Sequence, residues 1–367
     1  MKTAIIHYWL VNMRGGEKVL EALLELFPEA DIFTHVYAPD AMPDSIKSHK
    51  IYTSYIQGLP LAKKLYQLYM PLMPNALNEF NLQDYDLIIS SESGPSKGVV
   101  PNPDAYHICY CHSPMRYLWD MYHEYFRKSN PFVKFFMKRL IPKLRLYDVV
   151  SANLVDLFVA NSKYVANRIK RYYNREASIV FPPVDIEKYR HIKREPGDSY
   201  LFFGQLTGYK RADLAIEACI ALNKKLIVAG AGLKKNDIKK YEKTGLIDFR
   251  GRVSDDELKK LYSAAKALLF PGIEDFGIVP VEAQAAGCPI IAYKGGGALE
   301  TVLEDVTGLF FAEQTSVSLQ DAIVRFEAVE KNGVFNNREA FVNHVSQFSK
   351  QNFSDKIMQI IGEKKRK

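Results

Sequence analysis

Two glutamates flank a predicted turn from a buried strand into a helix, at a spacing suited to binding a sugar. Glu274 follows the apolar run ALLFPG, and Glu282 comes eight residues later in an Ala-rich helix expected to begin near Gly277. Eight residues are about two helical turns, so both carboxylates point to roughly the same side. A helix start offers free N–H groups to a phosphate, whereas carboxylates accept hydrogen bonds from sugar or ribose hydroxyls. The alternative is an acid that stabilises the helix dipole and a second, surface acid.

A pair of cations stands at another predicted strand-to-helix junction. Lys210 and Arg211 follow the run SYLFFGQL and its turn glycine, Gly204. Cations placed there neutralise a diphosphate as it departs from a sugar. The alternative for Lys210 is a solvated lysine at a helix start.

The N-terminal half contributes a glycine pair and a histidine. Gly15 and Gly16 lie between the first predicted strand and helix, where glycine permits close approach of a phosphate or an acceptor; a plain tight turn is the alternative. His112 ends the run AYHICYCH, and an imidazole there can hydrogen-bond a transferring sugar or orient an acceptor. We assign Arg116, four residues later, with the two glycines to the acceptor or phosphate side.

Strands alternating with helices must position these residues. Because short apolar runs alternate with helix-period stretches, we expect an α/β protein with parallel sheets, whose ligands lie beyond the carboxyl ends of the strands. The pattern breaks around Pro182-Pro183 and Pro196-Gly197, which predicts a linker at 183–199 between domains 1–182 and 200–349. The predicted strand runs are TAIIHYWL, ADIFTHVY, DLIISSE, AYHICYCH, LFVANS, SYLFFGQL, KKLIVAGAG, IDFRG, ALLFPG and PIIAYKG.

The stretch ALLFPGIEDFGIVPVEAQAAGCPIIAY resembles glycosyltransferase family 4, whose signature has two glutamates separated by seven residues. The resemblance covers essentially the whole chain. It implies the GT-B fold of two doubly wound Rossmann-like domains facing a cleft, with 350–367 completing the N-terminal domain. It also implies retaining hexosyl transfer without a metal or other cofactor.

The resemblance also implies roles for single residues. Glu282 would bind the ribose of the donor nucleotide and Glu274 the donor sugar. The amides around Phe276, Gly277 and Ile278 would face the donor phosphate or sugar. His112 stands where the family has a histidine that acts near the donor sugar and its phosphate.

One position departs from the family pattern. The family has G-R-L, five residues and then K; Lys210 matches the lysine, but Gln205 stands where the arginine is expected. Either Arg211 or a residue of the other domain replaces that charge, or the leaving group is stabilised less.

The stretch HSPMRYLWD resembles the branch with O-antigen mannosyltransferases, which implies GDP-mannose as donor in cell-surface polysaccharide or lipopolysaccharide synthesis. We expect domain closure to position the donor and a saccharide or lipid-linked acceptor, while the donor phosphate deprotonates the acceptor hydroxyl. The alternatives are a UDP-sugar donor, a GT-B sugar-nucleotide epimerase, and a nonenzymatic carbohydrate- or membrane-binding protein.

Composition limits the partners. The net charge of +7 suits anionic partners, and no apolar run is long enough to span a membrane. Segment 126–147 interleaves basic and apolar residues without an acid, which favours an anionic membrane surface; a core helix with a solvated basic face is the alternative. No nucleic-acid motif is present. With four scattered cysteines and no signal peptide, we expect a soluble cytoplasmic protein, peripheral at the inner face of the membrane.

One metal motif is set aside. Asp84-Tyr85-Asp86 spells D-x-D, but it lies at the amino end of a predicted strand, away from the edge where ligands bind. The sequence therefore predicts no metal site.

Overall fold

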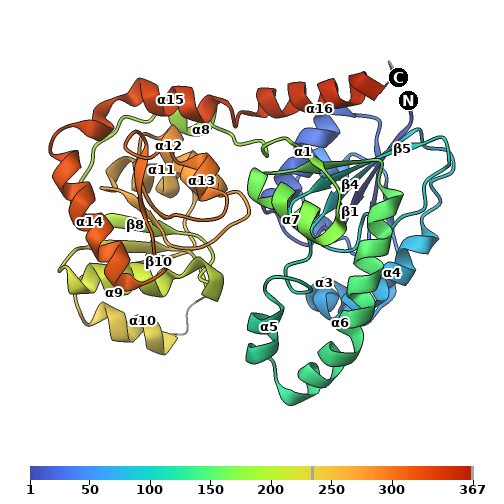
Figure 1. The fold of residues 1–367 in the computed structure, drawn as a ribbon, viewed down its shortest axis with the longest axis horizontal. Coiled ribbons are helices and arrows are strands. Elements are labelled where there is room, and N and C mark those ends of the chain that lie inside the picture. Colours follow the sequence, from blue (N-terminus) through green and yellow to red (C-terminus); the bar gives the residue numbers. More distant parts are fainter. Residues whose placement is uncertain (233–234, 365–367) are drawn as a thin grey trace. The chain divides into compact units, whose positions relative to one another are not determined.

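The computed structural model describes residues 1–232 and 235–364 (Figure 1). Contacts divide the chain into two compact units, unit 1 (Met1–Pro182 with Ser354–Lys367) and unit 2 (Pro183–Phe353). Residues 365–367, the end of the segment predicted to complete the N-terminal domain, lie outside the described residues.

Unit 1 is built on a parallel sheet with the strand order β3-β2-β1-β4-β5-β6-β7. The order reverses between β1 and β4, which are hydrogen-bonded neighbours, so this is the topological switch point where α/β sheets bind ligands. The strands are β1 (Thr3–His7), β2 (Asp31–Thr34), β3 (Ile51–Thr53), β4 (Leu87–Glu92), β5 (Tyr106–Cys111), β6 (Leu157–Ala160) and β7 (Ala177–Ile179).

The helices of unit 1 carry local start and stop signals. In α6, Asn130 accepts a hydrogen bond from the Val133 N–H and Pro131 takes the first helical position, a favoured pair at a helix start. The helices are α1 (Gly15–Leu26), α2 (Asp44–Lys47), α3 (Ala62–Leu65), α4 (Met73–Ala76), α5 (Tyr122–Lys128), α6 (Pro131–Ser151) and α7 (Lys163–Tyr173), joined by most of α16 (Lys350–Lys364).

Unit 2 has a second parallel sheet, with the order β10-β9-β8-β11-β12-β13 and a switch point between β8 and β11. Its strands are β8 (Tyr200–Phe203), β9 (Leu226–Ala229), β10 (Ile247–Gly251), β11 (Leu268–Phe270), β12 (Ile290–Tyr293) and β13 (Gly308–Phe311). Its helices are α8 (Glu187–Arg190), α9 (Ala212–Ala221), α10 (Lys235–Glu242), α11 (Asp255–Ala264), α12 (Ile278–Ala285), α13 (Ala298–Thr301), α14 (Ser316–Glu330) and α15 (Arg338–Ser346).

The expected α/β architecture with two parallel sheets is confirmed. Each predicted strand run contains one of these strands, and β3, β7 and β13 come in addition. All three extra strands lie at a sheet edge and are three or four residues long.

Segment 183–199, predicted as a linker, packs within unit 2. It contains α8, and the Val184 N–H donates to the Phe348 carbonyl at 2.9 Å. The Arg194 guanidinium donates to the carbonyls of Tyr262 and Ser263 at 2.9 and 2.7 Å, which satisfies open carbonyls at the end of α11. The segment therefore starts unit 2.

Candidate functional site

In unit 2, two predicted site residues meet at the switch point. Lys210 lies in the connection that follows β8, and Glu274 lies in the loop that follows β11. Their Nζ and Oε1 atoms are 2.8 Å apart, and both side chains are partly exposed. Neighbouring strands β8 and β11 thus bring together a cation and an anion 64 positions apart in the sequence.

Glycines make this approach possible. A Cβ on Gly272 would lie 2.7 Å from the Lys210 Cα and 2.9 Å from the Tyr209 carbonyl oxygen. Gly204, with φ +145°, leaves room for the Lys210 ammonium, which would lie 3.1 Å from a Cβ at that position. Any side chain at Gly272 would push the two connections apart.

The Lys210 ammonium is held in its charged form. Burial alone would lower its pKa, but the charges of Glu274 and Tyr209 and the hydrogen bond to Glu274 together outweigh burial and raise the pKa above the ordinary value. A lysine that is charged near pH 7 and lies beyond the carboxyl end of β8 is suited to a diphosphate. Its three N–H donors let it bind a phosphate oxygen while keeping a bond to Glu274.

The second glutamate lies on the helix that follows. The helix α12 begins at Ile278, and Gly277 precedes it in the left-handed region with φ +99°. Phe276 is buried and packs edge-on against Phe348. Glu282 is 7% exposed, and its Oε2 accepts a long hydrogen bond from the Tyr262 hydroxyl at 3.4 Å.

The loop after β12 supports the Glu274 loop, a feature that the sequence analysis missed. The Gly297 N–H donates to the Glu274 carbonyl at 2.9 Å, and a Cβ on Gly297 would lie 2.2 Å from the Phe276 carbonyl oxygen. Gly296 has φ +64°, and a Cβ there would lie 2.5 Å from the Glu274 carbonyl oxygen. The signal available in the sequence was three consecutive glycines, Gly295 to Gly297, one residue after a strand.

Arg211 is not drawn into the Lys210–Glu274 pair. Its Nη2 donates to the Asp213 carboxylate at 2.8 Å, and its Nη1 to the Gln314 carbonyl at 3.5 Å. Gln205 is exposed in the same connection. In this arrangement Arg211 neutralises Asp213, an acid of the helix that it precedes.

In unit 1, His112 is fixed by three neighbouring strands. Its N–H donates to the Glu92 carbonyl at 2.9 Å, and its carbonyl accepts from the Asn161 side chain at 2.9 Å. Its Nε2 lies 2.8 Å from the Ser91 hydroxyl. The ends of β4, β5 and β6 thus converge on His112. Burial, and secondly the neighbouring His7, lower its pKa to about 3, so the ring is neutral near pH 7.

The glycine pair opens α1 beside the end of β1. A Cβ on Gly16 would lie 2.4 Å from the Tyr8 hydroxyl oxygen, so the close neighbour that Gly16 accommodates is Tyr8. Burial above all raises the pKa of that hydroxyl. Arg116 lies 3.5 Å from the Asp120 carboxylate, which also accepts from Arg168 at 2.6 Å.

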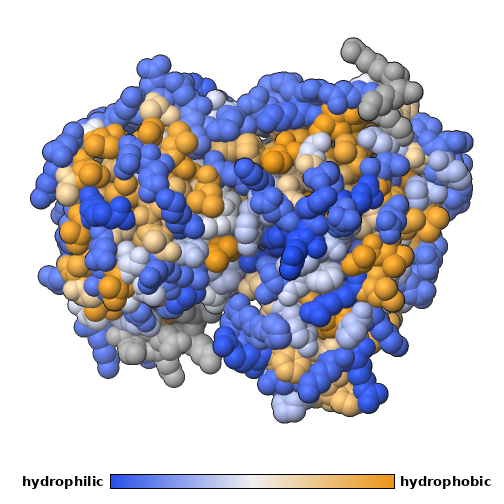
Figure 2. Space-filling view, in the orientation of Figure 1, coloured by the Kyte–Doolittle hydropathy of each residue, from blue (hydrophilic) through white to orange (hydrophobic). Residues whose placement is uncertain are grey.

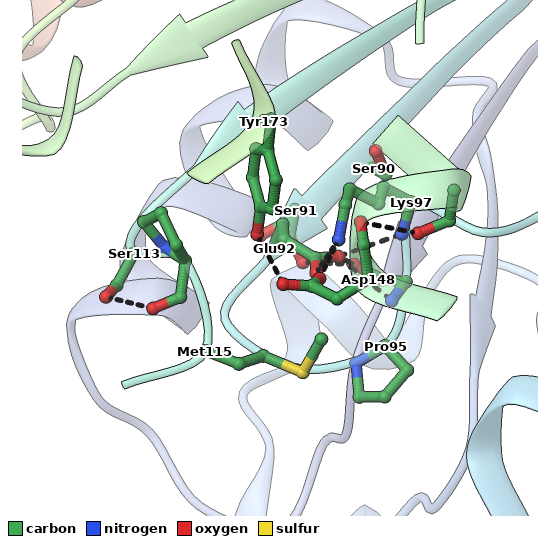
Figure 3. Close-up of polar contacts among 12 residues, drawn as sticks. Ser90, Ser91, Glu92, Pro95, Lys97, Ser113, Met115, Asp148 and Tyr173 are labelled. Carbon is green, nitrogen blue, oxygen red and sulfur yellow. Dashed lines mark hydrogen bonds and ion pairs between the residues drawn. The ribbon is translucent and has the colours of Figure 1, made fainter. Parts of the chain in front are cut away.

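A buried charge cluster of Glu92, Lys97 and Asp148 was also missed from the sequence (Figure 3). The Lys97 ammonium contacts both carboxylates, with Glu92 Oε1 at 3.2 Å. Asp148 also accepts from Trp119 at 2.7 Å and from Tyr173 at 2.9 Å. Burial alone would lower the Lys97 pKa, but the two carboxylates raise it. The cluster fastens α6 to the end of β4, and Asp148 is too far from Lys97 in the sequence for a local pattern to pair them.

The two aspartates of the D-x-D motif precede β4 and contact Lys2. Asp86 Oδ2 accepts from the Lys2 N–H at 2.7 Å, and Asp84 pairs with the Lys2 ammonium at 3.9 Å. Within residues 1–232 and 235–364, no three His, Cys, Asp or Glu side chains gather so as to hold a metal ion.

The chain matches known families over most of its length. A model described as Glycosyltransferase Family 4 matches residues 13–188, and one described as Glycosyl transferases group 1 matches residues 185–347. Among solved structures, HepE of Anabaena in complex with UDP has a TM-score of 0.70 at 17% identity, covering 99% of this chain and 100% of its own. At that identity the likeness shows the fold.

Curated relatives match parts of the chain. The uncharacterized glycosyltransferase MJ1607 of Methanocaldococcus jannaschii is 35% identical over 119 residues, which cover 30% of each chain. The α-1,3/1,6-mannosyltransferase ALG2 of Homo sapiens is 26% identical over 258 residues, covering 59% of this chain and 58% of its own. The matches thus cover 30% of the length of MJ1607 and 58% of the length of ALG2.

The two family models together account for residues 13–347, and both units have the expected parallel sheets. The chain therefore belongs to the family 4 type of glycosyltransferases and has the GT-B fold.

Proposed function

We propose that the protein is a retaining, metal-independent hexosyltransferase that moves a sugar from a nucleotide-sugar to a saccharide or lipid-linked acceptor in cell-surface polysaccharide synthesis. GDP-mannose is the favoured donor, and a UDP-sugar is the alternative. The contact between Lys210 and Glu274 at the switch point of unit 2 carries the proposal.

The donor side of the mechanism follows from unit 2. Glu282 accepts hydrogen bonds from the ribose hydroxyls, and Glu274 accepts from hydroxyls of the donor sugar. Lys210 and the N–H groups at the start of α12 face the diphosphate. When the bond from the anomeric carbon to the diphosphate breaks, Lys210 stabilises the charge on the departing oxygen.

The acceptor is activated by the leaving group. The acceptor hydroxyl forms the new bond to the anomeric carbon on the face that the diphosphate leaves, and its proton passes to a diphosphate oxygen. The neutral ring of His112 hydrogen-bonds the sugar. Orientation and preorganised charge then supply most of the rate enhancement.

Two observations bear on the donor. ALG2 is named a mannosyltransferase, which supports mannose. HepE has been solved with UDP and with UDP-glucose, which favours the alternative of a UDP-sugar on the same fold. The departure at Gln205 fits neither donor better.

Thermal unfolding with a panel of nucleotides tests the proposal, because a ligand that binds the native state raises Tm with its affinity. We expect GDP and GDP-mannose to raise Tm. At a ligand concentration a hundredfold above Kd, binding adds about 2.7 kcal/mol to the free energy of unfolding. The rise should be the same with and without EDTA, because the proposed transfer needs no metal. ADP is the control. An unchanged Tm with every nucleotide contradicts an enzyme that uses a nucleotide-sugar. If the protein isomerises the donor sugar without an acceptor, it is an epimerase.

We further propose that α5 and α6 bind an anionic membrane surface that carries a lipid-linked acceptor. Segment 126–147 forms the end of α5 and most of α6, and Phe132, Phe135 and Phe136 of α6 are 72%, 51% and 42% exposed. The Arg139 guanidinium lies 4.4 Å from the Phe135 ring centre. Figure 2 shows hydrophobic and hydrophilic residues side by side in this part of unit 1. Such exposed aromatic rings argue against a core helix for the first half of α6.

A vesicle-binding assay checks this surface. Each basic residue near an anionic bilayer contributes about 1 kcal/mol, so replacing Lys134, Lys138 and Arg139 by Gln should weaken binding roughly a hundredfold. The matched control replaces three exposed lysines of unit 2, Lys225, Lys243 and Lys331. Equal binding by both triple variants contradicts the proposal. Among the described residues, no helix is both long and apolar enough to cross a bilayer.

A further inference from the structure

A series of polar side chains connects His112, which directly follows β5, to residues at the switch point of unit 1. His7 at the end of β1 and Ser91 on β4 are paired in the sheet register. The Ser91 hydroxyl lies 3.0 Å from His7 Nδ1 and 2.8 Å from His112 Nε2. On its far side, His7 Nε2 lies 3.6 Å from Glu17 Oε1. His7, Ser91 and Glu17 are at most 1% exposed.

Glu17 sets the direction of this chain. Its Oε2 accepts from the Arg14 N–H at 2.9 Å, at the start of α1, where the helix dipole favours a negative charge. A carboxylate only accepts hydrogen bonds. Glu17 therefore favours the His7 tautomer that carries its proton on Nε2, the nitrogen that faces the carboxylate. The distance of 3.6 Å is too long for a hydrogen bond, but the field of a buried charge still acts over it.

The remaining protons follow in order. In the tautomer of His7 that carries its proton on Nε2, Nδ1 has a lone pair, which accepts from the Ser91 hydroxyl. The Ser91 oxygen then accepts from a His112 Nε2–H. Because burial keeps His112 neutral, its Nδ1 carries a lone pair. The reverse order would set a lone pair of His7 against the Glu17 carboxylate.

We propose that Glu17, through His7 and Ser91, holds the His112 proton on Nε2 and so presents Nδ1 as an acceptor for a hydroxyl group of the sugar substrate. This inference rests on the proposed function. A phosphate oxygen only accepts hydrogen bonds, so this tautomer recognises the sugar rather than the diphosphate. Glu17, His7 and Ser91 are positioning residues, since they act through His112.

Histidine nitrogen NMR on the full-length protein reads the tautomer directly and needs no substrate. His107 on β5 is an internal reference, because its Nδ1 lies 2.8 Å from the Leu154 carbonyl and must donate, while its Nε2 lies 2.8 Å from the Ser90 hydroxyl. We expect the proton on Nε2 in His112 and on Nδ1 in His107. A His112 protonated on Nδ1 overturns the proposal.

Glu17→Gln provides the sharpest test. The glutamine oxygen must stay opposite the Arg14 N–H, so its NH₂ group faces His7 Nε2 and favours a lone pair there. We expect the hydrogen bonds through His7, Ser91 and His112 to reverse their direction. The His112 proton then moves to Nδ1, while the His107 tautomer stays unchanged. An unchanged His112 tautomer refutes the role of Glu17.

Two neighbouring serines form a matched pair of controls. Ser90 and Ser91 are both fully buried on β4, and each lies 2.8 Å from a histidine Nε2. Ser91→Ala should give His112 a mixture of tautomers, whereas Ser90→Ala should change only His107. Equal effects of both variants on the His112 tautomer contradict the proposal that Ser91 connects His7 to His112.

A kinetic readout separates this inference from the proposed function. We expect Glu17→Gln to lower kcat/KM for glycosyl transfer at least about tenfold while leaving nucleotide affinity unchanged. A reversed tautomer with unchanged kcat/KM refutes hydroxyl recognition by His112. If the wild-type protein transfers no sugar at all, the proposed function fails, and the NMR result still decides the tautomer.

Discussion

Glu282→Ala should weaken the binding of the donor nucleotide roughly a hundredfold. Hydrogen bonds to a charged group contribute about 1.5–3 kcal/mol each, and loss of the ribose contacts would remove about 3 kcal/mol in total. The side chain is 7% exposed, so few water molecules can replace it. Calorimetry with GDP and UDP measures the loss.

Glu327→Ala is the matched control for that variant. Glu327 also lies in unit 2 and accepts from a tyrosine hydroxyl, that of Tyr200, at 2.9 Å. Both variants remove a glutamate with a tyrosine partner, so both should lower Tm without ligand. Only Glu282→Ala should lose the nucleotide, and full binding by this variant refutes the ribose role.

Lys210→Ala should lower kcat by about 10² to 10³, the effect of removing one preorganised group that stabilises charge in the transition state. The charge on the diphosphate grows as its bond to the sugar breaks, so the loss should fall on kcat more than on KM. Steady-state kinetics with the donor identified by thermal unfolding measures both constants.

The control for Lys210 is another lysine–glutamate pair of unit 2. Lys224 lies 2.8 Å from Glu327, the same distance as Lys210 from Glu274. Lys224→Ala therefore removes a comparable ion pair and should leave kcat unchanged. A kcat for Lys210→Ala equal to that of Lys224→Ala rules out leaving-group stabilisation by Lys210.

The sequence predicted the sheets well, except at their edges. Central strands such as β8 and β11 are buried and have continuous apolar sequences. The edge strands β3 and β7 are short and half exposed, and β7 continues into Pro182-Pro183, so their pattern resembles that of a loop. Pairing with one neighbour, rather than local composition, makes them strands.

The site was predictable where one local segment carries the chemistry. Glu274 and Lys210 each follow an apolar run, and parallel strands bring such ends together, as the structure places them. The series of side chains that connects Glu17 to His112 was not predictable. His7 and Ser91 are 84 residues apart in the sequence, and only the register of β1 and β4 pairs them. The roles of these residues stay predictions.

The cluster of Glu92, Lys97 and Asp148 also constrains how this protein can diverge. Removing one member of a buried ion cluster leaves an uncompensated charge and costs about 3–5 kcal/mol, a large part of the stability of a domain. Exchanging several members together for apolar residues of similar volume is far less damaging. Descendants of this chain should therefore either inherit Lys97 with both of its acids or lose the lysine in step with them.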